Sequence, residues 1–158
     1  MQTILVPVDG SVHALKALRI ACDLAEKYGG KVTLLHVLVE GRSADELLDL
    51  HAASTFGPVV TAQLRESAAQ VSVNLLEQIG LKILDQAATE TDRRGLETDQ
   101  LPIAIGDPVE NILIALKQSG ASTIVMGSRG AARRDPASFG SVSQAIFARA
   151  NCTCLSVK

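Results

Sequence analysis

The sequence has no excess of either charge and no long apolar segment. Its 158 residues include 15 lysines and arginines and 17 acidic residues, which gives a formal net charge of −2. The charges are interspersed, so no basic face predicts a nucleic-acid partner and no polybasic run predicts a membrane surface. No segment approaches the roughly 20 apolar residues of a membrane-spanning helix, and the N-terminal residues lack a signal-peptide pattern. We therefore expect a cytoplasmic protein whose ligand is a free small molecule.

Cysteine is scarce too, with three residues and no spacing typical of a disulfide scaffold, as in proteins of a reducing cytosol. Cys22 lies on the apolar face of a predicted helix, where we expect it to be part of the core. Cys152 and Cys154 would share one face of a strand. A metal or redox role for this pair would need further ligands, and burial as small apolar side chains is the alternative that the sequence favours.

The motifs of several enzyme classes are missing. The sequence contains no GxxxxGK[ST] loop, no GxGxxG fingerprint, no recognisable Ser/His/Asp order and no metal-ligand cluster. His13, His36 and His51 lack partners at catalytic or ligand spacing, so we expect structural or surface roles for them. No catalytic residue and no metal-binding side chain is therefore predicted. Hydrolysis of a bound nucleotide would be slow at most, because it would depend on magnesium and phosphate positioning alone.

Strand and helix patterns alternate along the chain, and 47% of the residues are hydrophobic, enough for one buried core. The apolar patterns predict strands at residues 4–8, 31–39, 96–105, 122–126 and 154–157. They predict principal helices at residues 14–28, 60–88, 108–120 and 141–150. Parallel strands joined by helices indicate a single doubly wound α/β domain, with a five-stranded parallel sheet and helices on both faces.

Some segments carry more specific expectations. Residues 40–57 lose the pattern and are interpreted as a variable insertion with a short amphipathic piece at 44–50 and a turn at Gly57 and Pro58. The helix at 60–88 is expected to be continuous, with a weak point at Gly80, and residues 89–95 to be solvated and frayed. Charged flanks place strand 96–105 at a sheet edge. Asp107 is expected to cap the following helix, with Pro108 at its first position.

The most informative segment lies near the C-terminus. Gly127, Ser128, Arg129 and Gly130 follow a buried strand, and nine residues separate Gly130 from a second group, GSVS at residues 140–143, which opens a helix. Glycines let the backbone approach an anion closely, and the N–H groups at the start of a helix attract negative charge. This arrangement predicts a phosphate-binding loop.

The position of this loop in the sheet leads to a second expectation. Ligands of doubly wound sheets bind beyond the carboxyl ends of the strands, where connections depart to opposite faces. If the first and fourth strands are neighbours, Asp9 and Gly127 both lie at that crevice.

Each of these residues also has a purely structural alternative. Ser141 and Gln144 have the spacing of a helix capping box, which needs no ligand. Asp9 could simply end a strand, or cap the first helix in competition with Ser11. Arg133 and Arg134 could clamp a phosphate or be ordinary solvated charges, and we favour the second interpretation.

Taken together, the segments VPVDGS, LLHV, GDPVENI, IVMGSRG and GSVSQ resemble the universal stress protein family. The G-x2-G-x9-G-[S/T] spacing at Gly127, Gly130, Gly140 and Ser141 is similar to that of its ATP-binding branch. The resemblance implies a Rossmann-like fold, a homodimer formed through the last strand, and ATP with Mg2+ held by the phosphates.

The resemblance also implies a role for each matching residue. Pro7, Val8 and Asp9 would line the nucleoside part of the site, with the Asp9 carboxylate accepting from ribose hydroxyls. Val37 would touch adenine, and Met126 and Gly127 would flank the nucleoside. Arg129 and Gly130 would cover the phosphates, whose oxygens would be held by Gly140, Ser141, Val142 and Ser143.

Three functions remain open at this point. The first is an ATP-binding stress-response module that acts by nucleotide occupancy. The second is a dimeric interaction module of the same fold with an unused nucleotide pocket. The third, an enzyme that cleaves nucleotides or transfers adenylyl groups, needs a catalytic group that the sequence does not show.

Overall fold

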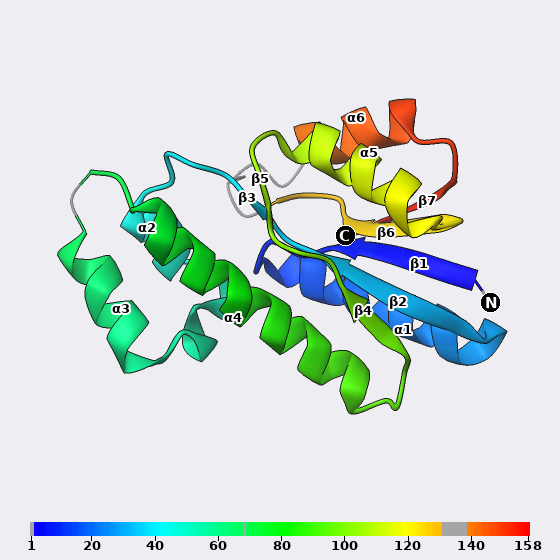
Figure 1. The fold of residues 1–158 in the computed structure, drawn as a ribbon, viewed down its shortest axis with the longest axis horizontal. Helices are drawn as coiled ribbons and strands as arrows, with labels where there is room; N and C mark the ends of the chain where they lie inside the picture. Colours follow the sequence, from blue (N-terminus) through cyan, green and yellow to red (C-terminus); the bar gives the residue numbers. More distant parts are fainter. Residues whose placement is uncertain (1, 68, 131–138) are drawn as a thin grey trace.

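A central sheet of five parallel strands, in the order β4-β2-β1-β6-β7, organises the molecule (Figure 1). The computed structural model describes residues 2–67, 69–130 and 139–158. The strands are β1 (Gln2–Pro7), β2 (Gly30–Leu35), β4 (Thr98–Gln100), β6 (Thr123–Gly127) and β7 (Thr153–Val157). Every pairing between them is parallel. The predicted doubly wound α/β fold is therefore confirmed.

Helices cover both faces of this sheet. Helices α1 (Val12–Tyr28) and α4 (Val73–Asp92) pack on one face, and α5 (Pro108–Ser119) and α6 (Ser141–Arg149) on the other (Figure 1). Residues of β1 alternate between the two cores: Ile4 and Val6 belong to the core under α1 and α4, and Leu5 to the core under α5 and α6. This alternation follows from the period of two along a strand, and it explains why the strands are apolar throughout.

The helix ends follow local sequence signals. Asp107 Oδ1 accepts from Glu110 N at 2.9 Å, Pro108 is the first residue of α5, and Gly120 ends it in the left-handed conformation. At α1 the cap is Ser11, whose hydroxyl accepts from Ala14 N at 3.1 Å. Asp9 does not cap this helix; its Oδ1 accepts from Ser11 N at 3.0 Å, immediately before it.

Two predicted strands are each divided. Instead of one strand over residues 31–39, β2 ends at Leu35 and β3 (Val37–Leu38) follows His36. The predicted strand 96–105 likewise becomes β4, at the sheet edge as expected, and β5 (Ala104–Ile105), which pairs with β3 in a separate two-stranded sheet. The physical reason is that β1 ends at Pro7 and turns toward α1. Beyond Leu35 the segment after β2 no longer has β1 as its partner. It therefore pairs only with β5, as the two-stranded β3–β5 sheet.

The prediction of one helix over residues 60–88 is wrong. Two helices occupy this region, α3 (Gly57–Glu66) and α4, and Ser72 caps α4 by accepting from Leu75 N at 3.2 Å. The expected weak point at Gly80 is wrong as well, because Gly80 is buried within α4. A Cβ atom there would lie 2.7 Å from His36 Cδ2, so the glycine allows close packing of the helix on His36.

The 40–57 segment, interpreted above as a variable insertion, is folded. It contains α2 (Ala44–Leu48) and a short 3-10 helix (His51–Thr55), and Gly57 and Pro58 begin α3 rather than forming a separate turn. Figure 1 shows α2 and α3 beside one end of α4. This region adds material next to the carboxyl ends of the strands.

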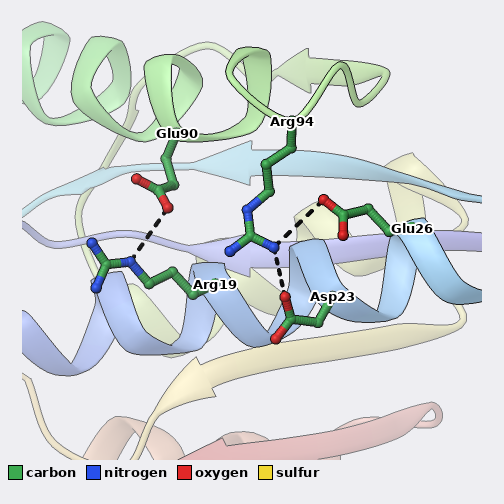
Figure 2. A network of polar contacts seen from close by, with 5 residues as sticks. All are labelled: Arg19, Asp23, Glu26, Glu90 and Arg94. Carbon is green, nitrogen blue, oxygen red and sulfur yellow. Dashed lines mark hydrogen bonds and ion pairs between the residues drawn. The ribbon is translucent and has the colours of Figure 1, made fainter.

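Residues 89–95 are mostly exposed, as expected, but the expectation that they are frayed is wrong. Helix α4 continues to Asp92, and Thr91 is completely buried. Arg94 binds Asp23 and Glu26 of α1 at 2.5 and 3.5 Å, and Arg19 of α1 binds Glu90 at 3.3 Å (Figure 2). These ion pairs join the ends of α1 and α4 at the amino-terminal edge of the sheet. In the described part of the chain, no helix combines the length and apolarity that a bilayer span requires.

Candidate functional site

The candidate site lies where β1 and β6 end side by side. The two strands pair through Ile4 with Thr123 and Leu5 with Ile124, so Asp9 and Gly127 meet at the carboxyl edge as predicted. From β1 the chain continues to α1 on one face, and from β6 it continues toward α6 on the other. This is a topological switch point, where doubly wound sheets bind their ligands.

A cavity of about 360 Å3 opens at this point. The structure brings every residue of the predicted site to its lining, from four separate stretches of the chain. These residues are Pro7, Val8, Asp9, Val37, Met126, Gly127, Arg129, Gly130, Gly140, Ser141, Val142 and Ser143.

One wall of the cavity is made mainly of backbone, and we call residues 127–130 and 140–143 the glycine wall. Gly140 N donates to Ser128 O at 2.7 Å, and Ser128 N donates to Val157 O of β7 at the same distance. The Ser143 hydroxyl donates to Gly127 O, again at 2.7 Å. The two glycine-bearing turns are therefore bonded to each other, to α6 and to the end of the sheet.

Two glycines of this wall lie close to neighbouring atoms. A Cβ atom at Gly140 would lie 3.3 Å from Ser128 O, and one at Gly130 would lie 3.3 Å from Asp9 Oδ2. Gly140 itself has φ −65°, which any residue can adopt, so space rather than backbone conformation explains its presence. Both glycines line the cavity, so a side chain at either position would have to fit between these neighbours and the cavity.

The N-terminus of α6 forms part of this wall. Gly140 is the N-cap residue, no side chain caps the helix, and Ser141 is its first residue. The capping-box alternative for Ser141 and Gln144 is therefore wrong. Gln144 N makes the first bond of the helix, to Gly140 O at 3.0 Å. Helix geometry leaves the preceding N–H groups, those of Ser141, Val142 and Ser143, without intrahelical acceptors, and such groups attract anions.

The opposite wall is built from side chains. Apolar residues dominate it, namely Pro7, Val8, Leu35, Val37, Val39, Pro108, Ile112 and Met126. They come from β1, β2, β3, β6 and the residues that directly follow β1 and β3, and from the first half of α5. Together with the charged residues Asp9, Arg42 and Glu46, they form what we call the side-chain wall. An apolar enclosure with few polar groups suits a flat ring system better than a phosphate.

His36 supports this wall from beneath. Its ring Nδ1 lies 2.8 Å from Val8 O and therefore carries the proton and donates to it. Burial is the largest influence on His36 and lowers the pKa of its imidazole, although the bond to Val8 acts in the opposite direction. The neutral ring thus joins β3 to Val8 of the cavity lining. His51, by contrast, is exposed.

Sequence reasoning missed several lining residues. Ala14, Leu35, Val39, Pro108 and Ile112 line the cavity, as do Arg42 and Glu46 of the insertion. Arg42 precedes Ser43, the N-cap of α2, and Glu46 lies within α2, so no local sequence pattern indicated that both side chains reach the cavity. The predicted alternatives for Arg133 and Arg134 concern residues outside those that the structure describes.

The cysteines lie away from this cavity. Cys22 is fully buried, as predicted, and burial raises the pKa of its thiol to about 11. Cys152 and Cys154 pack at the margin of the core under α5 and α6, and Cys154 Sγ donates to Cys152 O at 3.4 Å. Within the described ranges, no three His, Cys, Asp or Glu side chains are grouped so that they could hold a metal ion.

Sheet order, helix placement and cavity define a doubly wound α/β protein with a cavity at its switch point. The chain belongs to the universal stress protein family, whose family model matches residues 1–158. This confirms the resemblance seen in the sequence.

Individual relatives cover nearly the whole chain. The universal stress protein YxiE of Bacillus subtilis (strain 168) is 31% identical over 98% of this chain and 97% of its own. The structure of the protein MJ0577 is similar with a TM-score of 0.72 at 25% identity, covering 99% of this chain and 95% of that one. A universal stress protein from Archaeoglobus fulgidus in complex with dAMP has a TM-score of 0.67 at 20% identity, covering 100% and 98%.

Proposed function

We propose that this protein binds an adenine nucleotide, ATP with Mg2+, in the cavity between the glycine wall and the side-chain wall. It acts in the cytoplasm as a stress-response module that signals by nucleotide occupancy, with hydrolysis slow at most. The observation that carries the proposal is the pairing of an uncapped helix N-terminus with an apolar enclosure in one cavity. The first suits phosphates, and the second suits a nucleoside base.

The dimensions and the relatives support this ligand class. A cavity of about 360 Å3 lies within the range of small-molecule sites. Membership of the universal stress protein family supports a role in the stress response. The Archaeoglobus fulgidus protein of the same fold is described with dAMP, an adenine nucleotide.

Each wall has a defined role in the proposal. Gly130 and Gly140 leave room for phosphate oxygens, which accept from the first N–H groups of α6. Asp9 accepts from ribose hydroxyls, and Val37 and Met126 enclose the base. Because a neutral hydrogen bond contributes only about 0.5–1.5 kcal/mol, affinity comes from several such contacts together with apolar enclosure.

Mg2+ would be bound through the nucleotide. The described residues offer no cluster of ligating side chains, and Mg2+ is commonly held by substrate phosphates and water with few protein ligands. The ion would neutralise phosphate charge, and the residues of the glycine wall would orient the chain of phosphates.

Calorimetric titration of nucleotide-free protein with Mg-ATP tests the proposal. We expect saturable binding with one site per chain. Protein that takes up neither ATP nor AMP would refute it. Phosphate release measured on the same preparation should stay far below one turnover per second, and several turnovers per second would refute the occupancy mechanism.

A homodimer formed through β7 is also proposed. Strand β7 is the edge of the five-stranded sheet, and its residues from Cys154 to Val157 are only partly buried within one chain. An unpaired edge of this kind is a template for pairing with a second chain. Light scattering at micromolar concentration should give the mass of two chains, and a monomer would contradict the proposal.

The same open edge favours the second candidate, an interaction module whose nucleotide pocket is unused. The titration separates the two functions, because a dimer that binds no nucleotide would leave only this candidate.

A further inference from the structure

The 40–57 segment places an ion pair in the side-chain wall that the proposed nucleotide contacts do not use. Arg42 and Glu46 both line the cavity, and Arg42 Nε lies 3.6 Å from Glu46 Oε2. At this distance the contact is an ion pair rather than a close hydrogen bond. The guanidinium therefore keeps much of its donor capacity for another partner.

The backbone and the surroundings fix the position of Arg42. Its carbonyl accepts from Val71 N at 3.3 Å, which ties the segment after β3 to the residues preceding α4. The Arg42 side chain is 18% exposed, whereas that of Glu46 is 49% exposed. The buried Arg42 Nη2 atom has no hydrogen-bond partner among residues 2–67, 69–130 and 139–158. A buried donor without an acceptor is costly, so a ligand that supplies one gains affinity.

The sheet order places this donor in the half of the cavity opposite the phosphates. Arg42 and Glu46 follow β3, on the β2 side of β1, whereas the glycine wall follows β6 on the other side of β1. Val37 and Val39, which line the same cavity, lie on the segment that leads to Arg42.

We infer that Arg42 is a specificity-determining residue that donates a hydrogen bond to the nucleoside half of the ligand, and that Glu46 is a positioning residue that orients it. The acceptor is a ring nitrogen of the base or a ribose oxygen. This inference rests on the proposed function.

The test compares ligands that differ only in phosphates. Arg42→Met keeps most of the length of the side chain but removes every donor. It should lower the affinities for AMP and for Mg-ATP by the same factor, about tenfold for a charged hydrogen bond. Both affinities are measured by calorimetry at about 150 mM salt, where long-range attraction is screened. Arg65→Met, at an exposed position of α3 outside the cavity, is the matched control and should leave both affinities unchanged.

The outcomes separate this inference from the proposed function. Wild-type protein that binds neither ligand refutes the proposed function. If Arg42→Met binds both ligands as tightly as the wild type, only the inference is refuted. A loss of affinity that is much larger for ATP than for AMP also refutes the inference, because it would place Arg42 at the phosphates. Arg42→Lys, which keeps the charge without the planar fork, guards against misfolding and should show a smaller, equally phosphate-independent loss.

Two further measurements refine the assignment. If the acceptor is the ribose 2′-hydroxyl, the penalty of Arg42→Met disappears with dAMP, and if it is the base, the penalty persists. Glu46→Gln should lower the affinity for AMP about threefold when Arg42 is present. It should not change the affinity of the Arg42→Met variant, because Glu46 acts through Arg42. Additive losses in this double-mutant cycle would refute the positioning role.

Discussion

The two walls of the cavity are built in different ways. The glycine wall is a short stretch of backbone whose shape depends on missing side chains, at Gly130 and Gly140. The side-chain wall collects residues from β1, the β2–β3 segment, the 40–57 segment, α5 and β6. The first is encoded locally, by glycine spacing and a helix start. The second exists only once distant segments have packed together.

Gly140→Asp should have the largest effect, and it acts on the glycine wall alone. The added carboxylate would lie at the N-terminus of α6, near Ser128 O, where the proposed phosphate binds. We expect calorimetry to show at least about a hundredfold loss of ATP affinity, since charge repulsion and lost space act together. The free energy of unfolding should change by less than about 1 kcal/mol, because aspartate is a favoured N-cap residue.

The matched control for this variant is Val73→Asp. It adds a carboxylate at the first turn of α4, where Val73 is exposed and outside the cavity, and it should leave ATP affinity intact. If Gly140→Asp binds ATP normally while remaining folded, the phosphates do not use this wall.

Gly80→Ala tests the packing beneath the side-chain wall. Alanine gains about 1 kcal/mol of helix propensity, but its Cβ would lie 2.7 Å from the His36 ring and 3.0 Å from Ile103. Overpacking of this kind costs about 1–3 kcal/mol, and the ring cannot move without losing its bond to Val8. Urea unfolding should therefore show a net loss of about 1–2 kcal/mol. Glu77→Ala, at an exposed position of α4, is the control. If Gly80→Ala instead stabilises the protein, the His36 ring can shift to make room for the added methyl group.

The pH dependence of stability tests the same support. Because burial lowers the pKa of His36 below its ordinary 6.5, the unfolded chain takes up a proton near that pH while the folded protein does not. The unfolding free energy contributed by His36 is therefore present above pH 6.5 and decreases as the pH falls below it, by at most about 1.4 kcal/mol per pH unit. Urea unfolding between pH 7 and pH 5 should show a shallower decrease for His36→Asn, which can keep a donor toward Val8. Equal slopes would show that His36 titrates normally.

The smallest effect is expected at the opposite edge of the sheet. Arg94→Met removes the ion pairs to Asp23 and Glu26, which are partly exposed (Figure 2). Such pairs contribute about 0–1 kcal/mol each, so thermal unfolding should shift by only a few degrees. ATP affinity should not change, because no member of this network lines the cavity. A loss of affinity would indicate coupling between the two edges.

The fold and the glycine wall could be predicted because their signals are local. Asp107 and Pro108 start α5 where the sequence indicates, and the glycines of residues 127–140 place the loop between β6 and α6. The lining of the side-chain wall was predicted only where the resemblance supplied it, as for Val37. Arg42 and Glu46 reach the cavity because the 40–57 segment packs beside the strand ends, which no local pattern specifies.

The break between α3 and α4 was missed for a different reason. Val60, Leu64, Val71 and Leu75 keep helical spacing across it, and all four are buried. The spacing of the apolar residues thus continues from α3 into α4 without a shift, so periodicity alone predicts one helix. Ser72, which caps α4, was the signal that could have revealed the break.

The cavity draws on both ends of the chain, from Pro7 at the end of the first strand to Ser143 in the last helix. Any opening that releases either end therefore destroys the site. A ligand bound with dissociation constant Kd raises the free energy of such openings by RT ln(1 + [L]/Kd), about 2.7 kcal/mol at a hundredfold excess over Kd. Amide hydrogen exchange in β1 and in α6 would then slow together when the site is filled. Ligand binding would thus make opening of the whole domain rarer.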